Sequence, residues 1–305
     1  MPISFDEENL GFSQIPDAEE KNAICPGTLY LVATPIGNLA DVSERAKKIL
    51  AGVDFIAAED TRNSAKLLNC LGITNSMVSY YEHNRAQRGP QILKRLQNGE
   101  SCALISDAGT PAISDPGEDL VRLCAKEQIP VTSVPGCCAA ITALTLSGLS
   151  TVRFAFEGFL GGTHTEHLAR LKQVCQDPRT LIFYEAPHRL IATLSDFFTV
   201  FGDRKIALCR ELTKKNEEIL RTTIADALTY YETHTPRGEY VLIVEGIREE
   251  EQFAQAFWRD MDVPTHIAYY MEQGMKRMDA MKACAKDRGV SKSEIYRMAE
   301  EWKQK

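Results

Sequence analysis

The sequence predicts an α/β fold with two α/β domains and a small helical segment after them. Short apolar runs alternate with helical patterns twice, over residues 27–150 and again over 151–247. Strand signals then vanish, and residues 248–305 have only helical periodicity. The length of 305 residues suits two domains, and 44% hydrophobic with 25% charged residues is typical of a globular protein.

The first domain is expected to hold a parallel sheet. Its strands are predicted at Thr28–Ala33, Phe55–Ala58, Cys102–Ile105 and Val131–Val134. The first of these runs is apolar on both alternating faces, which is typical of strands covered by helices on both sides. Asp41 with Glu44 predicts a capped helix start. Gly72 is expected to end the next helix, and Pro90 suits the first turn of a third.

Two more helices complete this domain. Asp115, Pro116 and Glu118 predict a capped helix start after the third strand, and small residues form a helix from Cys137 to Leu146. The second domain continues the alternation, with strands predicted at Phe154–Phe156, Leu181–Tyr184, Ile206–Cys209 and Tyr240–Val244 and a helix that buries Leu190, Leu194, Phe197 and Phe198.

The last segment, Met278 to Trp302, reads as two helices joined at Arg288 and Gly289, with Ser291 and Glu294 as a capping box. Such a helix-turn-helix is either a packing hairpin or a nucleic-acid contact, and base rates favour packing.

The start of the chain is expected to be a disordered acidic tail. Residues 1–26 hold six acidic side chains and one lysine, without the basic start and apolar core of a signal peptide. No run approaches the roughly 18 apolar residues of a membrane span. Nine scattered cysteines without a C-x-x-C pair suit a reducing cytosol, so we expect a cytoplasmic protein.

Three loops carry the marks of a binding site at the carboxyl ends of the predicted strands, where open parallel sheets bind ligands. They are Thr34–Asn38, Ser106–Gly117 and Pro135–Cys138, and the second is far longer than the roughly 2–6 residues of an ordinary connection. The phosphate-binding glycine patterns of ATP and NAD sites are missing, and no H-E-x-x-H metal pattern occurs, so no metal is expected. A cofactor without phosphates, held by backbone groups and one carboxylate, suits such loops.

The motifs then become recognisable. The chain resembles the bacterial ribosomal RNA small subunit methyltransferase I family, within the tetrapyrrole methylase-like (class III) S-adenosylmethionine methyltransferases. The resemblance spans about residues 27–302 in unbroken order and rests on Thr34–Asp41, Ala57–Arg62, Ser106–Pro111, Ser114–Gly117, Val134–Gly136, Ala139–Leu144, Phe183–Arg189, Arg210–Lys214 and Gly238–Gly246.

This resemblance implies a tetrapyrrole methylase-like fold with the cofactor in the cleft between the two α/β domains. It also implies a homodimer that methylates the ribose 2′-hydroxyl of a decoding-centre cytidine in 16S rRNA. Carried onto this chain, the contacts to S-adenosyl-L-methionine fall on Pro35, Gly37, Asp107, Ala108, Gly109, Thr110, Cys138, Ala139, Tyr184 and Glu185.

The catalytic candidates follow the second predicted strand. A ribose hydroxyl is a poor nucleophile, so a base or a cation that favours the alkoxide should help. We expect Glu59 or Asp60 to act as base or to orient the hydroxyl, and Arg62 to bind phosphate or developing charge. The alternative for Asp60 is that it only caps the following helix.

Two other functions stay open. One is a tetrapyrrole methyltransferase acting on a uroporphyrinogen- or precorrin-like substrate, but the first loop lacks the glycine-rich G-x-G-P-G-D of those enzymes. The other is a non-catalytic RNA-binding protein. The net charge of −7 comes largely from residues 1–26, whereas residues 270–305 hold nine basic and six acidic side chains. RNA contact is therefore expected to be local, through cleft arginines and the mildly basic C-terminal helices. This favours an assembled small ribosomal subunit over free rRNA as substrate.

Overall fold

The computed structural model describes residues 23–248 and 257–303, apart from the side chains of 300–303. The chain divides into two compact units, Met1–Gly246 and Ile247–Lys305, each considered by itself. An acidic tail is predicted for residues 1–26, and residues 1–22 of it lie outside the described residues. No helix in the described ranges has the length and apolarity needed to cross a bilayer.

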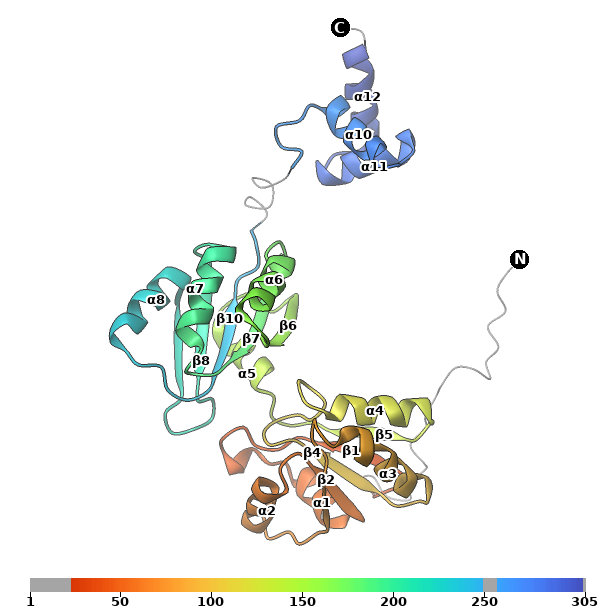
Figure 1. The fold of residues 1–305 in the computed structure, drawn as a ribbon, viewed down its shortest axis with the longest axis vertical. Coiled ribbons are helices and arrows are strands. Elements are labelled where there is room, and N and C mark those ends of the chain that lie inside the picture. The colour runs from red at the N-terminus through yellow and green to blue at the C-terminus, as the bar shows by residue number, and fades with distance from the viewer. Residues whose placement is uncertain (1–22, 249–256, 304–305) are drawn as a thin grey trace, which may run out of the picture. The chain divides into compact units, whose positions relative to one another are not determined.

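The first unit contains two five-stranded sheets, which confirms the predicted fold class (Figure 1). The first sheet is wholly parallel, in the order β3-β2-β4-β1-β5. Its strands are β1 (Leu29–Val32), β2 (Phe55–Ala58), β3 (Met77–Ser79), β4 (Cys102–Ile105) and β5 (Val131–Val134). The short edge strand β3 was not predicted, because three half-buried residues carry no clear pattern.

Helices cover both faces of this sheet, and this explains why β1, β2 and β4 are apolar throughout. The helices along this part of the chain are α1 (Glu44–Gly52), α2 (Thr61–Cys70), α3 (Arg85–Gln97), α4 (Gly117–Lys126) and α5 (Ala139–Ser147). On one face Ile49 of α1 packs with Val32 and Ile56. On the other, α3 and α4 bury Leu96 and Leu120.

Two of the predicted helix starts were wrong. Helix α1 is capped by Ser43, whose Oγ accepts from the amide of Ala46 at 3.1 Å, while Asp41 lies in a separate 3-10 turn (Leu39–Asp41). Helix α3 begins at Arg85, and Pro90 is its sixth residue, beyond the first turn where a proline costs no hydrogen bond. Because proline has no backbone N–H, the helix lacks one intrahelical hydrogen bond at this position.

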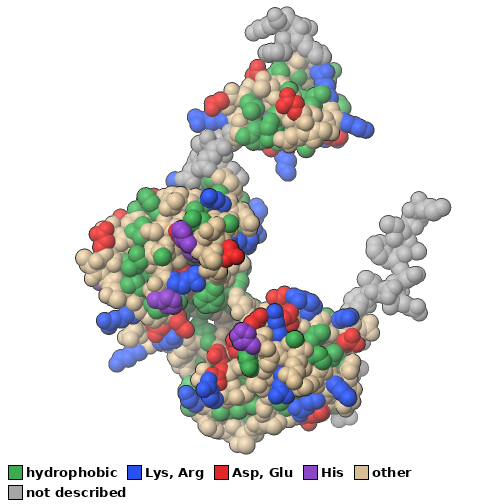
Figure 2. Space-filling model, viewed as in Figure 1, with side chains coloured by type: hydrophobic (Ala, Val, Ile, Leu, Met, Phe, Trp, Pro, Cys, Tyr) green, Lys and Arg blue, Asp and Glu red, His purple; other side chains and the backbone are tan. Residues whose placement is uncertain are grey.

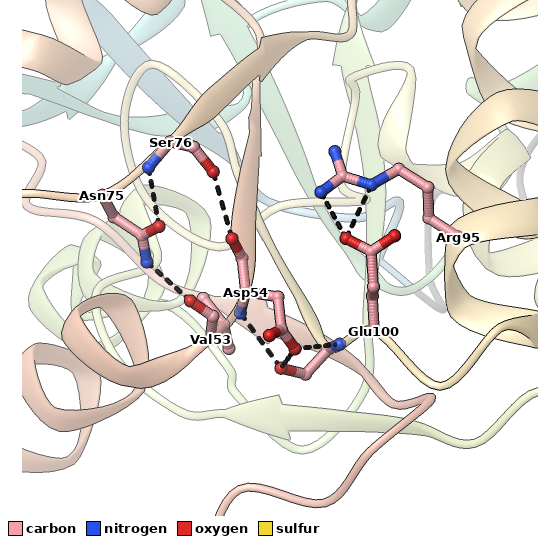
Figure 3. A network of polar contacts seen from close by, with 7 residues as sticks. Val53, Asp54, Asn75, Ser76, Arg95 and Glu100 are labelled. Carbon is pink, nitrogen blue, oxygen red and sulfur yellow. Dashed lines mark hydrogen bonds and ion pairs between the residues drawn. The ribbon is translucent and has the colours of Figure 1, made fainter.

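The amino ends of the first sheet are fixed by side-chain hydrogen bonds (Figure 3). The Asp54 carboxylate accepts from the amide and the hydroxyl of Ser101 at 2.7 and 2.6 Å, which joins the starts of β2 and β4. The Ser76 hydroxyl donates to the carbonyl of Asp54 at 3.0 Å, and Arg95 pairs with Glu100. These polar contacts occupy the edge opposite to the loops expected to bind a ligand.

The second sheet has the order β6-β7-β10-β8-β9 and is mixed. Only β6 and β7 are parallel, whereas β10 runs antiparallel to both β7 and β8. The strands are β6 (Phe154–Phe159), β7 (Thr180–Glu185), β8 (Lys205–Arg210), β9 (Glu218–Thr223) and β10 (Tyr240–Val244). Strand β9 was missed, because as an edge strand it has no fully buried residue.

One face of the second sheet is covered by α6 (His164–Val174), α7 (Leu190–Phe201) and α8 (Ile224–Thr233). The other face is covered by α5, whose Ala140, Ala143 and Leu144 pack against Ile182 and Val241 (Figure 1). Helix α5 was assigned to residues 27–150 of the first domain. Its core contacts are nevertheless with the second sheet, so this helix links the two halves of the unit.

The second unit holds α10 (Val263–Glu272), α11 (Arg277–Asp287) and α12 (Lys292–Lys303), as the helical prediction expected. It has its own apolar core, which includes Ile267, Met281 and Ile295. The predicted capping box is confirmed, because Ser291 Oγ accepts from the amide of Glu294 while the Glu294 carboxylate accepts from the amide of Ser291.

Candidate functional site

The first unit contains a pocket of about 550 Å³ that residues of both sheets line. Its lining includes nine of the residues proposed from the sequence: Glu59, Asp107, Ala108, Gly109, Thr110, Cys138, Ala139, Tyr184 and Glu185. Sites for small molecules commonly measure about 300–1,000 Å³. The pocket is therefore large enough for a nucleoside-sized ligand.

The three predicted loops are hydrogen-bonded to one another beside this pocket. The amide of Thr34 donates to the carbonyl of Gly109 at 2.9 Å, and the amide of Gly109 donates back to Thr34 at 3.1 Å. The Thr110 hydroxyl donates to the carbonyl of Cys137 at 2.9 Å. The loops that follow β1, β4 and β5 thus form one connected rim.

The loop after β4 is held in an unusual backbone conformation. Ala112 and Ser114 have φ of +67° and +61°, a region that costs residues with a side chain about 1–3 kcal/mol each. The Asp115 carboxylate offsets this cost by accepting from the amides of Ala112 and Gly117 at 3.0 and 2.7 Å. Helix α4 begins at Gly117, close to the predicted start, but its N-cap is Pro116 without a side-chain cap, so the predicted capping box is wrong.

Three carboxylates, those of Glu59, Asp107 and Asp115, line the wall of the pocket that the first sheet provides. Burial raises the pKa of Glu59, and the negative charge of Asp107 raises it further, although a backbone hydrogen bond from Asp107 opposes the shift. Burial also raises the pKa of Asp115. Glu59 is therefore a stronger base than an ordinary carboxylate, which suits it to accept a proton.

The opposite wall is aromatic. The ring of Tyr184 meets Phe156 and Phe159 edge to face, with centroids 5.0 and 5.3 Å apart. Its hydroxyl accepts from the amide of Ala140 at 3.2 Å, and burial raises the pKa of Tyr184 to about 12. Phe159 is 57% exposed and lines the pocket, so an aromatic surface is available to a ligand.

Glu185 also borders the pocket, but its carboxylate is already engaged. Its oxygens accept from the Thr193 hydroxyl at 2.5 Å and from the amide of Ala186 at 2.8 Å, and Arg189 pairs with it at 3.6 Å. The residue is only 2% exposed. The carboxylate therefore stabilises the start of α7.

Four predicted residues are absent from the pocket lining: Pro35, Gly37, Asp60 and Arg62. Asp60 caps α2 by accepting from the amide of Arg62 at 2.8 Å, the contact that its alternative role expects, and it pairs with the Arg62 guanidinium at 3.1 Å. Gly37 lies against the loop after β8, where an added Cβ would come within 2.4 Å of Lys214 Cγ.

From the second sheet, sequence reasoning predicted only Tyr184 and Glu185 of β7, and it missed the residues around β8 and β10 as well as several loop residues of the first half. The additional lining residues are Ile36, Ser106, Ile113, Ser114, Asp115, Phe159, Ala186, Pro187, Cys209, Glu211, Leu212, Lys214, Glu239, Tyr240 and Val241. The antiparallel β10 brings Tyr240 opposite Glu185 and Arg210, so its amino end meets the carboxyl ends of β7 and β8. Ligands bind at the carboxyl ends of strands, so the positions directly after β8 could have been predicted as site residues. The positions before β10 lie at an amino end and could not.

Lys214 is the cation nearest to these additional carboxylates. Its Nζ lies 2.9 Å from Glu211 Oε1 and 2.9 Å from Glu239 Oε2. A hydrogen bond from the Glu239 backbone and the contact with Lys214 lower the pKa of Glu211. The loops after β8 and before β10 therefore bring one positive and two negative charges to the pocket.

Comparisons with known proteins agree with this architecture. Residues 28–228 match the family of Tetrapyrrole (Corrin/Porphyrin) Methylases. The crystal structure of uroporphyrin-III C-methyltransferase from Thermus thermophilus superposes with a TM-score of 0.52 at 18% identity, covering 72% of this chain and 94% of that chain. A diphthine synthase structure gives 0.57 at 10% identity, covering 74% and 93%. These likenesses show the fold.

Relatives of higher identity are named Ribosomal RNA small subunit methyltransferase I. The protein from Halalkalibacterium halodurans is 47% identical over 270 residues, which cover 88% of this chain and 93% of that protein. Those from Synechocystis and Escherichia coli O157:H7 are 44% and 42% identical, cover 90% of this chain, and match over 97% and 94% of their own lengths. The chain therefore belongs to the tetrapyrrole methylase family and, within it, to the ribosomal RNA small subunit methyltransferase I family.

Proposed function

We propose that this protein transfers a methyl group from S-adenosyl-L-methionine to the ribose 2′-hydroxyl of a cytidine in 16S rRNA of the small ribosomal subunit. The observation that carries the proposal is the pocket that joins Glu59, with its raised pKa, to the Asp107–Thr110 loop and the aromatic wall. The names of the relatives support rRNA of the small subunit as substrate.

The residues present fit the cofactor. Asp107 is exposed in the pocket, so its carboxylate can accept from the hydroxyls or the amino group of the cofactor. Backbone groups of Ala108–Thr110 and the apolar side chains of Ile36, Leu212 and Val241 supply further contacts. We assign cofactor contact to Asp107, Ala108, Gly109, Thr110, Cys138 and Ala139, with Tyr184 as part of the aromatic wall. Pro35, Gly37 and Glu185 instead shape the surrounding loops.

The bound cofactor supplies a methyl group on a sulfonium, which is an electrophile that needs a well-placed nucleophile. Positioning then contributes much of the acceleration. Glu59 accepts the proton of the ribose hydroxyl as the oxygen attacks, and its raised pKa makes this transfer more favourable. Arg62, whose side chain is 88% exposed, contacts an RNA phosphate while Asp60 holds its guanidinium.

Two experiments test this function. Calorimetric titration with S-adenosylmethionine should give a saturable signal, and heat no larger than dilution would refute cofactor binding. Small subunits from a strain that lacks the activity, incubated with tritiated cofactor, should acquire one label at an alkali-resistant linkage next to a cytidine. Label found only on a base would refute the 2′-O assignment, and uptake by free 16S rRNA equal to that by subunits would refute the assembled substrate.

The alternatives make different predictions. A tetrapyrrole methyltransferase would label uroporphyrinogen or a precorrin in the same assay, and a non-catalytic RNA-binding protein would bind subunits without labelling them. We further propose a cytoplasmic homodimer, which the relationship to this family supports. Light scattering of the purified chain should give a mass near twice 34.0 kDa.

A further inference from the structure

We propose that the C-terminal unit is a second RNA-binding element and that it docks on ribosomal RNA through one surface of α12. This surface, the α12 face, consists of Lys292, Ser293, Tyr296 and Arg297. The inference rests on the proposed function, because it takes rRNA as the substrate, and it adds a site remote from the pocket residues in sequence. The sequence leaves this unit open between a packing hairpin and a nucleic-acid contact, and its mildly basic helices already favour local contact with RNA.

The first observation is charge. Residues 276–297 contain seven Lys or Arg and three Asp or Glu. Each of the three carboxylates is engaged: Asp279 with Lys282, Asp287 with Tyr270 and His266, and Glu294 with Ser291. Figure 2 shows Lys and Arg side chains projecting from this unit. The surface therefore has an excess of cations whose neighbouring anions are already paired.

The second observation is the position of these cations. Ile295 and Ala299, four residues apart, are the buried side of α12. Ser293 and Arg297 have the same spacing and lie on the opposite side. Lys292 and Tyr296, also four residues apart, lie between the two sides, and all four side chains are exposed. Within the described residues neither Lys292 nor Arg297 forms a salt bridge, although the charge of Arg297 contributes to lowering the pKa of Glu294. They are therefore available to phosphate groups, which Lys and Arg bind most often in nucleic-acid complexes.

The third observation is an exposed aromatic ring. Tyr296 is 56% exposed although tyrosine carries a large apolar ring. Proteins that bind unpaired RNA stack bases on such rings, at about 1–3 kcal/mol per base. A tyrosine between two cations at helical spacing matches that chemistry.

The fold of the unit does not need the α12 face. The core is closed by apolar residues of all three helices, and a polar cluster joins α10 to α11. In that cluster Arg288 donates to the carbonyl of Met261 at 2.5 Å and to His266 Nδ1 at 3.1 Å, and the Tyr270 hydroxyl donates to Asp287 at 2.5 Å. Substitutions on the α12 face should therefore leave the unit folded.

The comparisons supply an independent argument. The tetrapyrrole methylase match ends at residue 228 and does not reach this unit. The match to the Halalkalibacterium halodurans rRNA methyltransferase covers 88% of the chain, which exceeds the first 246 residues, so it includes part of the C-terminal unit. The C-terminal unit therefore lies outside the residues that match the methylase family, and part of it is shared with the relative named as an rRNA methyltransferase.

The test uses the full chain with Lys292→Glu and Arg297→Glu together, and separately with Tyr296→Ala. A matched control carries Lys94→Glu and Lys126→Glu, which change the same charge on exposed positions of α3 and α4. A milder variant with Lys292→Gln and Arg297→Gln guards against misfolding of the first. Filter binding to small subunits over a salt series, the KM and kcat of methylation, and calorimetry with S-adenosylmethionine are measured for each.

We expect the charge variant to raise the KM for subunits at least tenfold, to change kcat less than twofold, and to leave cofactor affinity unchanged. The slope of log affinity against log salt should fall by about 2, because two phosphate contacts are lost. Tyr296→Ala should weaken subunit binding about fivefold or more. Binding and KM equal to the control would overturn the proposal.

The remaining outcomes separate this proposal from the proposed function. If the wild-type chain binds subunits but transfers no methyl group, the function fails, while weaker binding by the charge variant still supports the α12 face. If methyl transfer is intact and the variants match the control, only the α12 face fails. If light scattering shows a changed mass for the charge variant with subunit affinity retained, the surface is a protein contact and the proposal is wrong.

Discussion

Thr34 and Gly109 exchange two backbone hydrogen bonds, of 2.9 and 3.1 Å, across 75 positions of sequence. This isolated antiparallel bridge joins the loop after β1 to the loop after β4. Gly109 adopts φ of +81°, which L-residues with a side chain rarely reach. The rim of the pocket therefore depends on a glycine at this position.

Gly109→Ala should damage the cofactor site beyond its cost in stability. An added Cβ would lie 3.2 Å from Ile36 Cγ2, and the positive φ costs about 1–3 kcal/mol. The control is Gly99→Ala, which has φ of +91° and open space around the added Cβ. Both variants should lose comparable stability in urea unfolding, but only Gly109→Ala should weaken S-adenosylmethionine binding by tenfold or more. Equal cofactor affinity in the two variants would contradict this role for the bridge.

Asp107→Ala is expected to abolish detectable cofactor binding while the fold stays intact. The side chain is exposed in the pocket and contributes nothing to the apolar core, so its removal costs contacts to the ligand only. Glu118→Ala serves as control, because this exposed carboxylate on α4 pairs with Arg122 and lies outside the pocket lining. Calorimetry should show no saturable heat for Asp107→Ala with an unchanged Tm. Undiminished affinity would show that Asp107 is not a cofactor contact.

Most of the first sheet was predictable because β1, β2 and β4 are apolar on both faces and strands alternate with helices along this part of the chain. The second sheet gave a weaker signal, since strand direction leaves no mark on a short apolar run. Tyr240–Val244 was recognised as a strand, yet nothing in those five residues shows that it runs antiparallel to β7 and β8. Helix α5 posed a similar problem, because sequence order placed it with the first sheet while its apolar face packs on the second.

The site was predictable where a loop follows a parallel strand. The Asp107–Thr110 segment and Glu59 come directly after β4 and β2, and the structure places both in the pocket lining. Asp60 and Arg62 follow the same strand but begin a helix, where the carboxylate caps the first turn and binds its neighbour. Lys214 was not predicted as a site residue, because its partners Glu211 and Glu239 come close to it only in the folded chain.

Glu59→Gln should lower kcat about 10²–10⁴-fold and remove the acidic limb of the pH profile. Only the ionised carboxylate accepts a proton, so the wild-type rate should rise with pH as it passes through a pKa above the ordinary 4.5 and then level off. The measurement is single-turnover methylation of small subunits between pH 5 and 8. A variant with the wild-type pH profile would exclude Glu59 as the base.

Glu59→Gln should increase the stability of the protein at neutral pH, although it lowers kcat. A carboxyl whose pKa is raised by folding stabilises the protein when it is protonated, below its unfolded pKa, and loses that contribution as pH rises through the folded pKa. At neutral pH the ionised Glu59 therefore destabilises the folded state, and a neutral glutamine removes this destabilisation. Thermal unfolding should give Glu59→Gln the higher Tm at pH 7, and the difference should shrink near pH 4. A lower Tm at pH 7 would contradict the burial of this charge.

Thr193→Val should expose the structural role of Glu185. The substitution keeps the shape of the side chain but removes the hydroxyl that donates to the buried carboxylate at 2.5 Å. A buried acceptor that loses a partner costs about 1–3 kcal/mol, because nothing replaces the lost hydrogen bond. Urea unfolding should therefore show a destabilisation of that size, while the Kd for S-adenosylmethionine in the folded protein changes less than threefold. Thr199→Val is the control, since its hydroxyl donates only to the carbonyl of Ser195 on the exposed side of α7. A large loss of cofactor affinity with unchanged stability would instead return Glu185 to the set of cofactor contacts.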